Sequence, residues 1–311
     1  SAVPCTLYPV PLQTVPTPQF FVFGRTPALS AAELAAVLAR TRRRLPPILI
    51  GRGFLVVSEP LGEPTELIAR LGGIVKIGRV VHRGPALTGV PLAERIAESL
   101  AAGPTARRRV FGVRFLSGQH RQRIRRLLLA IKDQLGARDI RSRYVQSEQD
   151  VLSSVVVERE RLITEGAEIL IGDTETEQVI AVTEAVQPFA ALSARDYGRP
   201  RRNELAGLLP PKLAIAMLNL SRLGPEATVL DPFCGSGTVL QEAELLGFRT
   251  LIGTDASADA VGATRENLRW LLDHAAIDRS TVSLKLQVAS IETLPTLLGE
   301  HSVDGIVTEP Y

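Results

Sequence analysis

The sequence predicts a multidomain protein that combines α/β and α+β units. Its 311 residues exceed what one hydrophobic core usually organises, so two or three domains are expected. Charge divides the chain: residues 103–145 hold 12 Lys and Arg against two Asp, whereas residues 225–311 hold five against 13 Asp and Glu. A strand, glycine-rich turn, helix and strand pattern over residues 227–257 is typical of a ligand-binding parallel sheet.

Residues 1–18 contain five prolines and predict a disordered or extended leader. The first predicted domain spans residues 19–82. Its aromatic and β-branched run at 19–25 predicts a strand, and Ser30 with Glu33 predicts a capping box at the head of a helix over 31–40. A strand or hairpin at 49–58, a helix at 62–73 closed by glycine and a strand at 74–81 complete it.

The second predicted domain spans residues 83–187. Helices are predicted at 91–103 and 120–136, the second with an apolar face of Ile124, Leu127, Leu128, Ile131 and Leu135. Strands are predicted at 107–117, 153–163, 168–173 and 178–186.

Arginines crowd the middle of this second domain. A solvated helix face is the simple interpretation, but arginine in the first turns of the helix at 120–136 opposes the helix dipole. Aromatic residues are few there, which favours recognition of nucleic-acid backbone and shape over stacking on bases. We therefore predict a surface that binds RNA phosphates, formed by Arg107, Arg108, Arg109, Arg121, Arg123, Arg125, Arg126, Arg141 and Arg143.

A polar, proline-punctuated linker at 188–206 leads to the third predicted domain, residues 207–311. Pro210 and Pro211 suit the first turn of a helix over 210–224. Then follow a strand at 228–230, a helix at 238–246 and a strand at 251–254, which is the order of a Rossmann-like sheet.

The turn between the first strand and helix of that sheet predicts a cofactor site. It lacks the three glycines of a dinucleotide turn and the G-K-[ST] of a phosphate loop. Asp231 would repel a pyrophosphate but suits the ammonium of a methionine moiety, and Asp255 is placed to accept ribose hydroxyls, so S-adenosylmethionine is the predicted cofactor. The predicted contacts are Asp231, Pro232, Phe233, Cys234, Gly235, Ser236, Gly237, Thr238, Asp255, Ala256, Ala289 and Ser290.

Three collinear stretches resemble one enzyme family. DPFCGSGT at 231–238 with GTDAS at 253–257 resembles Rossmann-like methyltransferases that act on exocyclic amines. The stretch at 195–220 resembles a signature of tRNA guanosine-N2 methyltransferases with a THUMP domain, and the stretch at 21–38 resembles their N-terminal ferredoxin-like domain. The resemblance implies a ferredoxin-like domain, a THUMP RNA-binding domain and a methyltransferase domain, with tRNA as partner and the guanosine at position 10 as target.

The resemblance also implies catalytic residues at the end of the chain. The family motif is D-P-P-Y or close to it, and here the chain reads Thr308, Glu309, Pro310, Tyr311. Glu309 would accept hydrogen bonds from the target amine, Pro310 would hold a backbone carbonyl and Tyr311 would stack on the extruded base. One proline is missing and Glu is longer than Asp; aligned from its tyrosine, the motif puts Thr308 in the acid's place. An acid usual near Ala289 and Ser290 is also missing.

The expected strand order of the third domain is 3-2-1-4, with the fourth strand as an exposed edge, so the site is expected to be half enclosed. Two functions remain open: an S-adenosylmethionine-dependent tRNA guanine-N2 methyltransferase, or a noncatalytic tRNA-binding fragment or split-protein half. A methyltransferase of 23S ribosomal RNA is the alternative among enzymes. A complementing or activating protein subunit stays open too.

Several residue types favour simpler interpretations. Cys234 is expected to be packed rather than nucleophilic, and Asn267 to lie on a helix surface. Asp196 and Arg199 form either a salt bridge or part of a cofactor lid. The four histidines and two cysteines lack metal spacing, and no apolar run has the length of a membrane span, so we expect a cytoplasmic protein without metal.

Overall fold

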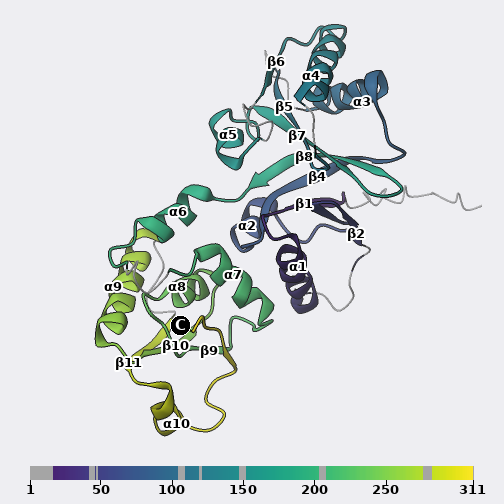
Figure 1. Cartoon of the computed structure of the whole chain (residues 1–311). Coiled ribbons are helices and arrows are strands. Elements are labelled where there is room, and N and C mark those ends of the chain that lie inside the picture. The colour runs from purple at the N-terminus through teal and green to yellow at the C-terminus, as the bar shows by residue number, and fades with distance from the viewer. Residues whose placement is uncertain are drawn as a thin grey trace, which may run out of the picture.

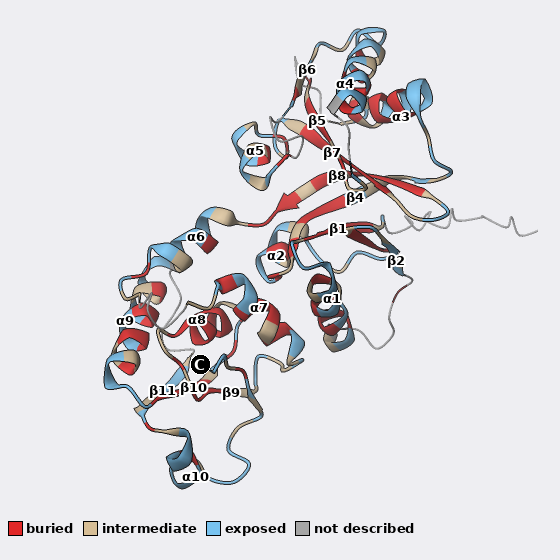
Figure 2. Cartoon of the chain, viewed as in Figure 1, coloured by how far each residue is buried: buried red, intermediate tan, exposed pale blue. Residues whose placement is uncertain are grey.

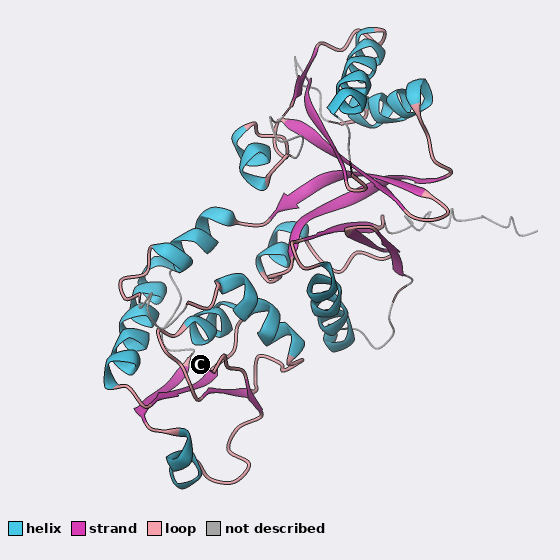
Figure 3. Cartoon of the chain, viewed as in Figure 1, coloured by secondary structure: helices cyan, strands magenta, loops and turns pink. Residues whose placement is uncertain are grey.

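The computed structural model describes residues 17–41, 46, 48–103, 109–118, 121–146, 152–202, 208–275 and 282–310, and the side chains of residues 41, 121 and 275 are outside this description. The chain folds around two sheets, one of eight strands and one of four (Figures 1 and 3). Helix α6 (Phe189–Tyr197) leads from the first sheet to the second. The predicted leader, apart from residues 17 and 18, lies outside the described residues.

The larger sheet has the strand order β2-β3-β1-β4-β8-β7-β5-β6. Its strands are β1 (Gln19–Phe23), β2 (Ile48–Gly51), β3 (Phe54–Val57), β4 (Ile74–Gly84), β5 (Arg109–Phe115), β6 (Ser142–Val145), β7 (Gly166–Asp173) and β8 (Gln178–Val186). Its helices are α1 (Pro27–Thr41), α2 (Pro64–Ala69), α3 (Gly89–Ala101), α4 (Arg121–Gly136) and α5 (Ser154–Arg159). Strand β4 pairs with β1 on one side and β8 on the other, so the boundary predicted between residues 82 and 83 falls inside a continuous sheet.

Burial follows the helix periodicity predicted for residues 120–136. Figure 2 shows the central strands of the larger sheet and the inner helix faces as buried parts of the protein. The five apolar residues predicted to share one face of α4 are all buried and pack with α3, β5 and β7. This prediction is confirmed because a 3.6-residue repeat fixes which side of a helix can leave water.

Two local predictions in this half were wrong. Residues 153–163 form helix α5 and a turn, not a strand, because the Ser153 side chain accepts the backbone N–H of Val156 at 3.3 Å and caps the helix. Ser30 and Glu33 form no capping box, since α1 begins three residues before Ser30. Both side chains instead serve tertiary contacts: Ser30 Oγ donates to the Gly73 carbonyl at 2.7 Å.

The smaller sheet has the order β11-β10-β9-β12, and all its pairings are parallel. Its strands are β9 (Thr228–Asp231), β10 (Thr250–Asp255), β11 (Ser283–Val288) and β12 (Gly305–Ile306). Helices α7 (Pro211–Leu220), α8 (Thr238–Leu245), α9 (Ala258–Ala275) and α10 (Leu294–Leu297) accompany it, with a 3₁₀ turn at Ile291–Thr293. The predicted order 3-2-1-4 is confirmed, and β12, which pairs with β9, leaves Ile306 59% exposed.

A buried polar cluster joins the two halves of the molecule. The Glu33 carboxylate, fully buried in α1, accepts the backbone N–H groups of Gly72 and Gly73 at 2.8 and 2.7 Å. Asn219 of α7 donates to the same carboxylate and to the Arg70 carbonyl, each at 2.8 Å. Burial raises the pKa of Glu33, while these hydrogen bonds oppose the rise. The partners of this carboxylate are backbone N–H groups and one side-chain amide, so these hydrogen bonds fix the position of α1 relative to α7.

Candidate cofactor site and catalytic segment

The turn after β9 is shaped by two glycines in left-handed conformation. Gly235 has φ +52° and Gly237 has φ +84°, values that residues with a Cβ rarely adopt. A Cβ on Gly237 would also lie 2.9 Å from the Thr264 side chain of α9. Cys234 N–H donates to the Thr254 carbonyl at 2.9 Å, which ties the turn to the end of β10. The backbone therefore bends sharply at the carboxyl ends of β9 and β10, where ligands of such sheets bind.

Asp231 lies at the bottom of this turn and is 2% exposed. Its Oδ1 accepts the Thr308 hydroxyl at 2.7 Å and the Phe233 N–H at 3.2 Å. Burial raises the pKa of Asp231 to about 6, the two hydrogen bonds lower it, and the charges of Asp255 and Glu309 raise it further. No described residue donates to Oδ2, which leaves one carboxylate oxygen able to receive a cationic group.

The Thr308 contact brings together two segments 77 residues apart in sequence. Parallel pairing of β12 with β9 makes this possible, because it puts the ends of both strands at one edge of the sheet. Glu309 is exposed and lines one small pocket together with Asp231, Phe233 and Gly235. Pro310 is exposed beside it, and Tyr311 lies outside the described residues.

Asp255 lies at the carboxyl end of β10, at the same edge of the sheet as Asp231 and Thr308. Its Oδ2 accepts the Gly235 N–H at 3.0 Å and its Oδ1 accepts the Ser257 N–H at 2.9 Å. The carboxylate is thus oriented by two backbone donors, and its remaining lone pairs can accept hydroxyls. Ala289 is buried with its N–H on the Asp255 carbonyl at 2.9 Å, while Ala256 is exposed next to that strand end. Ser290 is half-buried and precedes the 3₁₀ turn.

These residues fit a nucleoside that carries an amino acid, such as S-adenosylmethionine. A buried carboxylate with one free oxygen suits an ammonium, an oriented carboxylate suits a ribose, and the glycine turn lets backbone approach closely. The pocket at Asp231 encloses about 30 Å³, the space of about one water molecule, so the cofactor would lie across the strand ends rather than inside it. Cys234 is buried, and burial raises the pKa of its thiol to about 12, which agrees with a packed residue.

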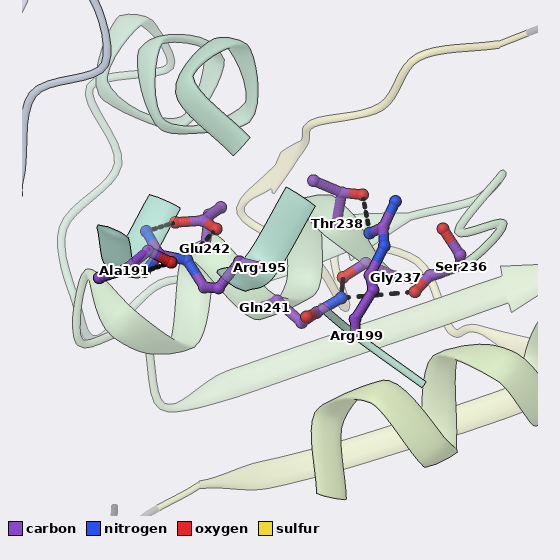
Figure 4. Close-up of polar contacts among 8 residues, drawn as sticks. All are labelled: Ala191, Arg195, Arg199, Ser236, Gly237, Thr238, Gln241 and Glu242. Atoms are coloured by element: carbon purple, nitrogen blue, oxygen red, sulfur yellow. Dashed lines mark hydrogen bonds and ion pairs between the residues drawn. The ribbon is translucent and has the colours of Figure 1, made fainter. Parts of the chain in front are cut away.

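The linker contributes contacts to this site that the sequence did not reveal. Arg199 is 3% exposed and donates through Nη1 to the Thr238 hydroxyl at 2.6 Å (Figure 4). It is therefore bonded to the first turn of α8 rather than held by an ion pair with Asp196. Arg195 forms an ion pair with the buried Glu242 of α8 at 2.6 Å (Figure 4). The linker is thereby fastened along α8, next to the glycine turn.

The expectation that Asn267 lies on a helix surface was wrong. Its side chain is fully buried and forms both backbone hydrogen bonds of Arg201, at 2.9 and 2.8 Å. Its Nδ2 also donates to the Ser236 carbonyl at 2.8 Å. Asn267 thus joins α9, the linker and the glycine turn. A helix-disfavouring Asn in the middle of a long helix was the available signal.

The predicted arginine surface is only partly present. Arg109 is 6% exposed and donates to the Gly103 carbonyl, so it points away from solvent. Arg143 is paired with Glu160 at 2.9 Å, and Arg123 lies 5.2 Å from the Phe115 ring centroid. The exposed residues of the set are Arg123, Arg125, Arg126, Arg141 and Arg143. Arg107, Arg108 and the side chain of Arg121 lie outside the described residues.

The described residues include no helix with both the length and the apolar composition for a bilayer span. They also contain no group of three or more His, Cys, Asp or Glu side chains arranged to hold a metal ion.

Comparison with known proteins identifies a family that matches the C-terminal part of the chain and relatives that match more than a third of its length. Residues 199–311 match the family described as RMKL-like, methyltransferase domain. A tRNA (guanine(10)-N2)-dimethyltransferase of Methanothermobacter thermautotrophicus is 34% identical over 128 residues, which are 39% of this chain and 34% of that protein. The protein of the same name from Methanocaldococcus jannaschii is 36% identical over 121 residues, which are 37% of this chain and 33% of that protein. The matches thus span about a third of these curated relatives. They confirm the predicted resemblance to tRNA guanine-N2 methyltransferases, whereas the resemblance to ferredoxin-like and THUMP domains stays a prediction.

Solved structures support the fold over almost the whole chain. TrmN from Thermus thermophilus superposes with a TM-score of 0.54 at 19% identity, covering 94% of this chain and 79% of that one. A possible methylase from Clostridium difficile gives 0.53 at 14% identity, covering 95% of this chain and 80% of that one. At such identities the likeness concerns the fold alone, and it confirms a mixed α/β architecture with a Rossmann-like sheet.

Proposed function

We propose that the intact protein methylates the exocyclic N2 of a guanosine in tRNA, at position 10, using S-adenosylmethionine. The observation that carries this proposal is the 2.7 Å hydrogen bond between Thr308 and Asp231, which joins the cofactor turn and the T-E-P-Y segment in one site. The names of the Methanothermobacter and Methanocaldococcus relatives support the same reaction and target. In this proposal residues 19–82 are a ferredoxin-like unit and residues 83–187 a THUMP unit, which share the larger sheet through β4, and the THUMP unit holds tRNA in the cytoplasm.

The chain's own groups would bind and orient the cofactor. Asp231 would accept the ammonium through its free oxygen, and this contact would favour the ionised carboxylate against the burial that raises its pKa. Asp255 would accept the ribose hydroxyls, held in place by the Gly235 and Ser257 N–H groups. When bound, S-adenosylmethionine supplies an electrophilic methyl group on a sulfonium.

The T-E-P-Y segment would prepare the target amine. The lone pair of guanine N2 is delocalised into the ring, so the amine is a weak nucleophile until its two hydrogens are fixed. Glu309 would accept one of these hydrogen bonds and a backbone carbonyl near Pro310 the other, which aims the lone pair at the methyl group. After transfer the extra proton would leave N2 to Glu309 or water. Tyr311 would stack on the extruded base.

A nucleoside assay tests this function. The chain is incubated with S-adenosylmethionine and unmodified tRNA transcripts, and digested RNA is examined by mass spectrometry for N2-methylguanosine. We expect the product with the parent chain, loss of it in Asp231→Ala and Glu309→Ala, and retention in Glu300→Ala, an exposed acid of the same domain that serves as control. Transcripts of 23S ribosomal RNA test the alternative substrate.

A chain that retains tRNA on a filter without forming the product would support the noncatalytic alternative. In that case the reaction would need a complementing protein subunit or further chain. Equal activity of Glu309→Ala and the parent would contradict the role given to Glu309.

A further inference from the structure

A second pocket lies where the two halves of the molecule meet. It measures about 540 Å³ and is bordered by the segment that precedes α1 and by the first turn of α7. Helices α1 and α7 lie beside each other in Figure 1, and the Glu33–Asn219 hydrogen bond joins them. We call this space the seam pocket; Arg25, Thr26, Gly73, Pro210, Lys212 and Leu213 are among its lining residues.

Among its described lining residues, the seam pocket carries positive charge without a compensating acid. Arg25 comes from the N-terminal half and Lys212 from the methyltransferase half, and both are exposed. Neither forms an ion pair with a described residue, and no described lining residue is acidic. Burial lowers the pKa of Lys212, and the charge of Arg25 lowers it further, so the two cations act on each other electrostatically. The N-terminal ends of α1 and α7 also border the pocket and add partial positive charge.

The Glu33 carboxylate is bonded to Gly72 and Gly73, which line the pocket, but Glu33 itself is not among the described lining residues. Glu33 lies behind Gly72 and Gly73 and is fully buried. Its carboxylate oxygens are already occupied by the two glycine N–H groups and by Asn219. The positive charges of Arg25 and Lys212 repel each other across the pocket, and a bound anion would offset this repulsion. The pocket is thus arranged for an anion.

We propose that the seam pocket binds a backbone phosphate of the RNA substrate between Arg25 and Lys212. The position favours a nucleic acid strand over a free anion. Leu209 lines the pocket at Asp231, and Pro210, the next residue, lines the seam pocket. A strand held at the seam pocket can therefore continue along the N-terminal end of α7 to Glu309. Because one cation comes from each half, this phosphate would also fix the RNA relative to both.

This inference rests on the proposed function, since it names a contact of the same RNA substrate. The test uses the full chain, tRNA transcripts and filter binding between 50 and 300 mM KCl. The variants are Arg25→Gln, Lys212→Gln and the double variant. The matched control is the double variant Arg269→Gln with Lys285→Gln, which removes two exposed positive charges of the methyltransferase half. Calorimetric binding of S-adenosylmethionine and circular dichroism report whether each variant is folded.

We expect the seam double variant to weaken tRNA binding by about five- to tenfold at low salt, and to lower the slope of log K against log[salt] by about 0.7–0.9, the value for one phosphate contact. The control double variant should change the slope by less than half of that. Equal affinity and slope in the two double variants would refute the proposal. If inorganic phosphate binds in a Lys212-dependent manner while tRNA affinity is unchanged, the pocket takes a free anion and the RNA assignment is wrong.

The two proposals can fail separately. A parent chain that binds tRNA but forms no N2-methylguanosine would contradict the proposed reaction, and the salt slopes would still test the seam pocket. A chain that methylates tRNA with unchanged slopes in the seam variants would support the reaction and refute the pocket.

Discussion

Gly72 is a position where adding a single methyl group should disturb the packing between the two halves of the molecule. A Cβ at residue 72 would lie 1.9 Å from the Lys212 carbonyl oxygen of α7 and 2.9 Å from its carbon. Because Cβ atoms essentially never approach other atoms within 3 Å, α7 would have to move by about 1 Å or more. Overpacking of this kind costs about 1–3 kcal/mol, and weakening of the neighbouring Gly72–Glu33 and Asn219 hydrogen bonds adds about 0.5–1.5 kcal/mol each.

The same substitution also restricts the unfolded chain, which stabilises the protein by about 0.4–1 kcal/mol. We therefore expect Gly72→Ala to lower the free energy of unfolding by about 2–4 kcal/mol. Gly62→Ala is the matched control, because a Cβ there would meet no atom within 4 Å. It should leave stability unchanged or raise it slightly.

Urea denaturation, followed by circular dichroism and by fluorescence of Trp270, the single tryptophan, measures both variants. Trp270 lies in α9 and reports on the methyltransferase half. Displacement of α7 should also reduce methylation, since Leu209 at its start lines the pocket at Asp231. Equal midpoints for Gly72→Ala and Gly62→Ala would refute the tight contact between Gly72 and α7.

Three further substitutions test buried polar groups. Asn219→Ala leaves the Arg70 carbonyl and one Glu33 oxygen without their shared donor, so unfolding free energy should fall by about 2–4 kcal/mol; a loss below 0.5 kcal/mol in urea denaturation would contradict this. Burial raises the pKa of Glu244 from 4.5 to about 7, so the folded state loses stability as pH rises from about 4.5 to about 7, and the loss is complete above 7. Glu244→Gln should therefore stabilise the protein by about 1–3 kcal/mol at pH 8 and by little at pH 5, as melting curves would show. Because burial raises the pKa of Asp231 to about 6, calorimetric affinity for S-adenosylmethionine should fall as pH drops through 6; in Asp231→Asn it should be at least about tenfold weaker and independent of pH in that range, and equal pH profiles would exclude Asp231 as the ammonium partner.

The sequence predicted those features that depend on residues close together in the chain. The glycines at 235 and 237 predicted a turn, and both adopt positive φ. The apolar repeat of residues 120–136 predicted the buried face of α4, because helix periodicity decides which side chains can leave water together. The strand–turn–helix–strand pattern, read with its family resemblance, also predicted the sheet order that brings Thr308 to Asp231.

Side chains whose partners lie far away in sequence were assigned wrongly. Ser30 and Glu33 have the spacing of a capping box, but their oxygens meet groups around residue 73 and Asn219. The valines of residues 155–157 favour a strand, yet a single cap at Ser153 and one buried face make a helix. Asn267 and Arg109 look like surface residues in sequence and are buried in the fold.

The sequence by itself thus determined most of the helices and strands, the glycine turn and the family that the chain resembles, because these depend on backbone conformation and periodicity over short stretches. Only the tertiary structure decided how the halves join, where Arg25 and Lys212 meet, and which arginines reach solvent. Those features depend on pairs such as Glu33 and Asn219, which are 186 residues apart. The role of a buried polar side chain depends on its hydrogen-bond partners, and the tertiary structure decides which partners are within reach.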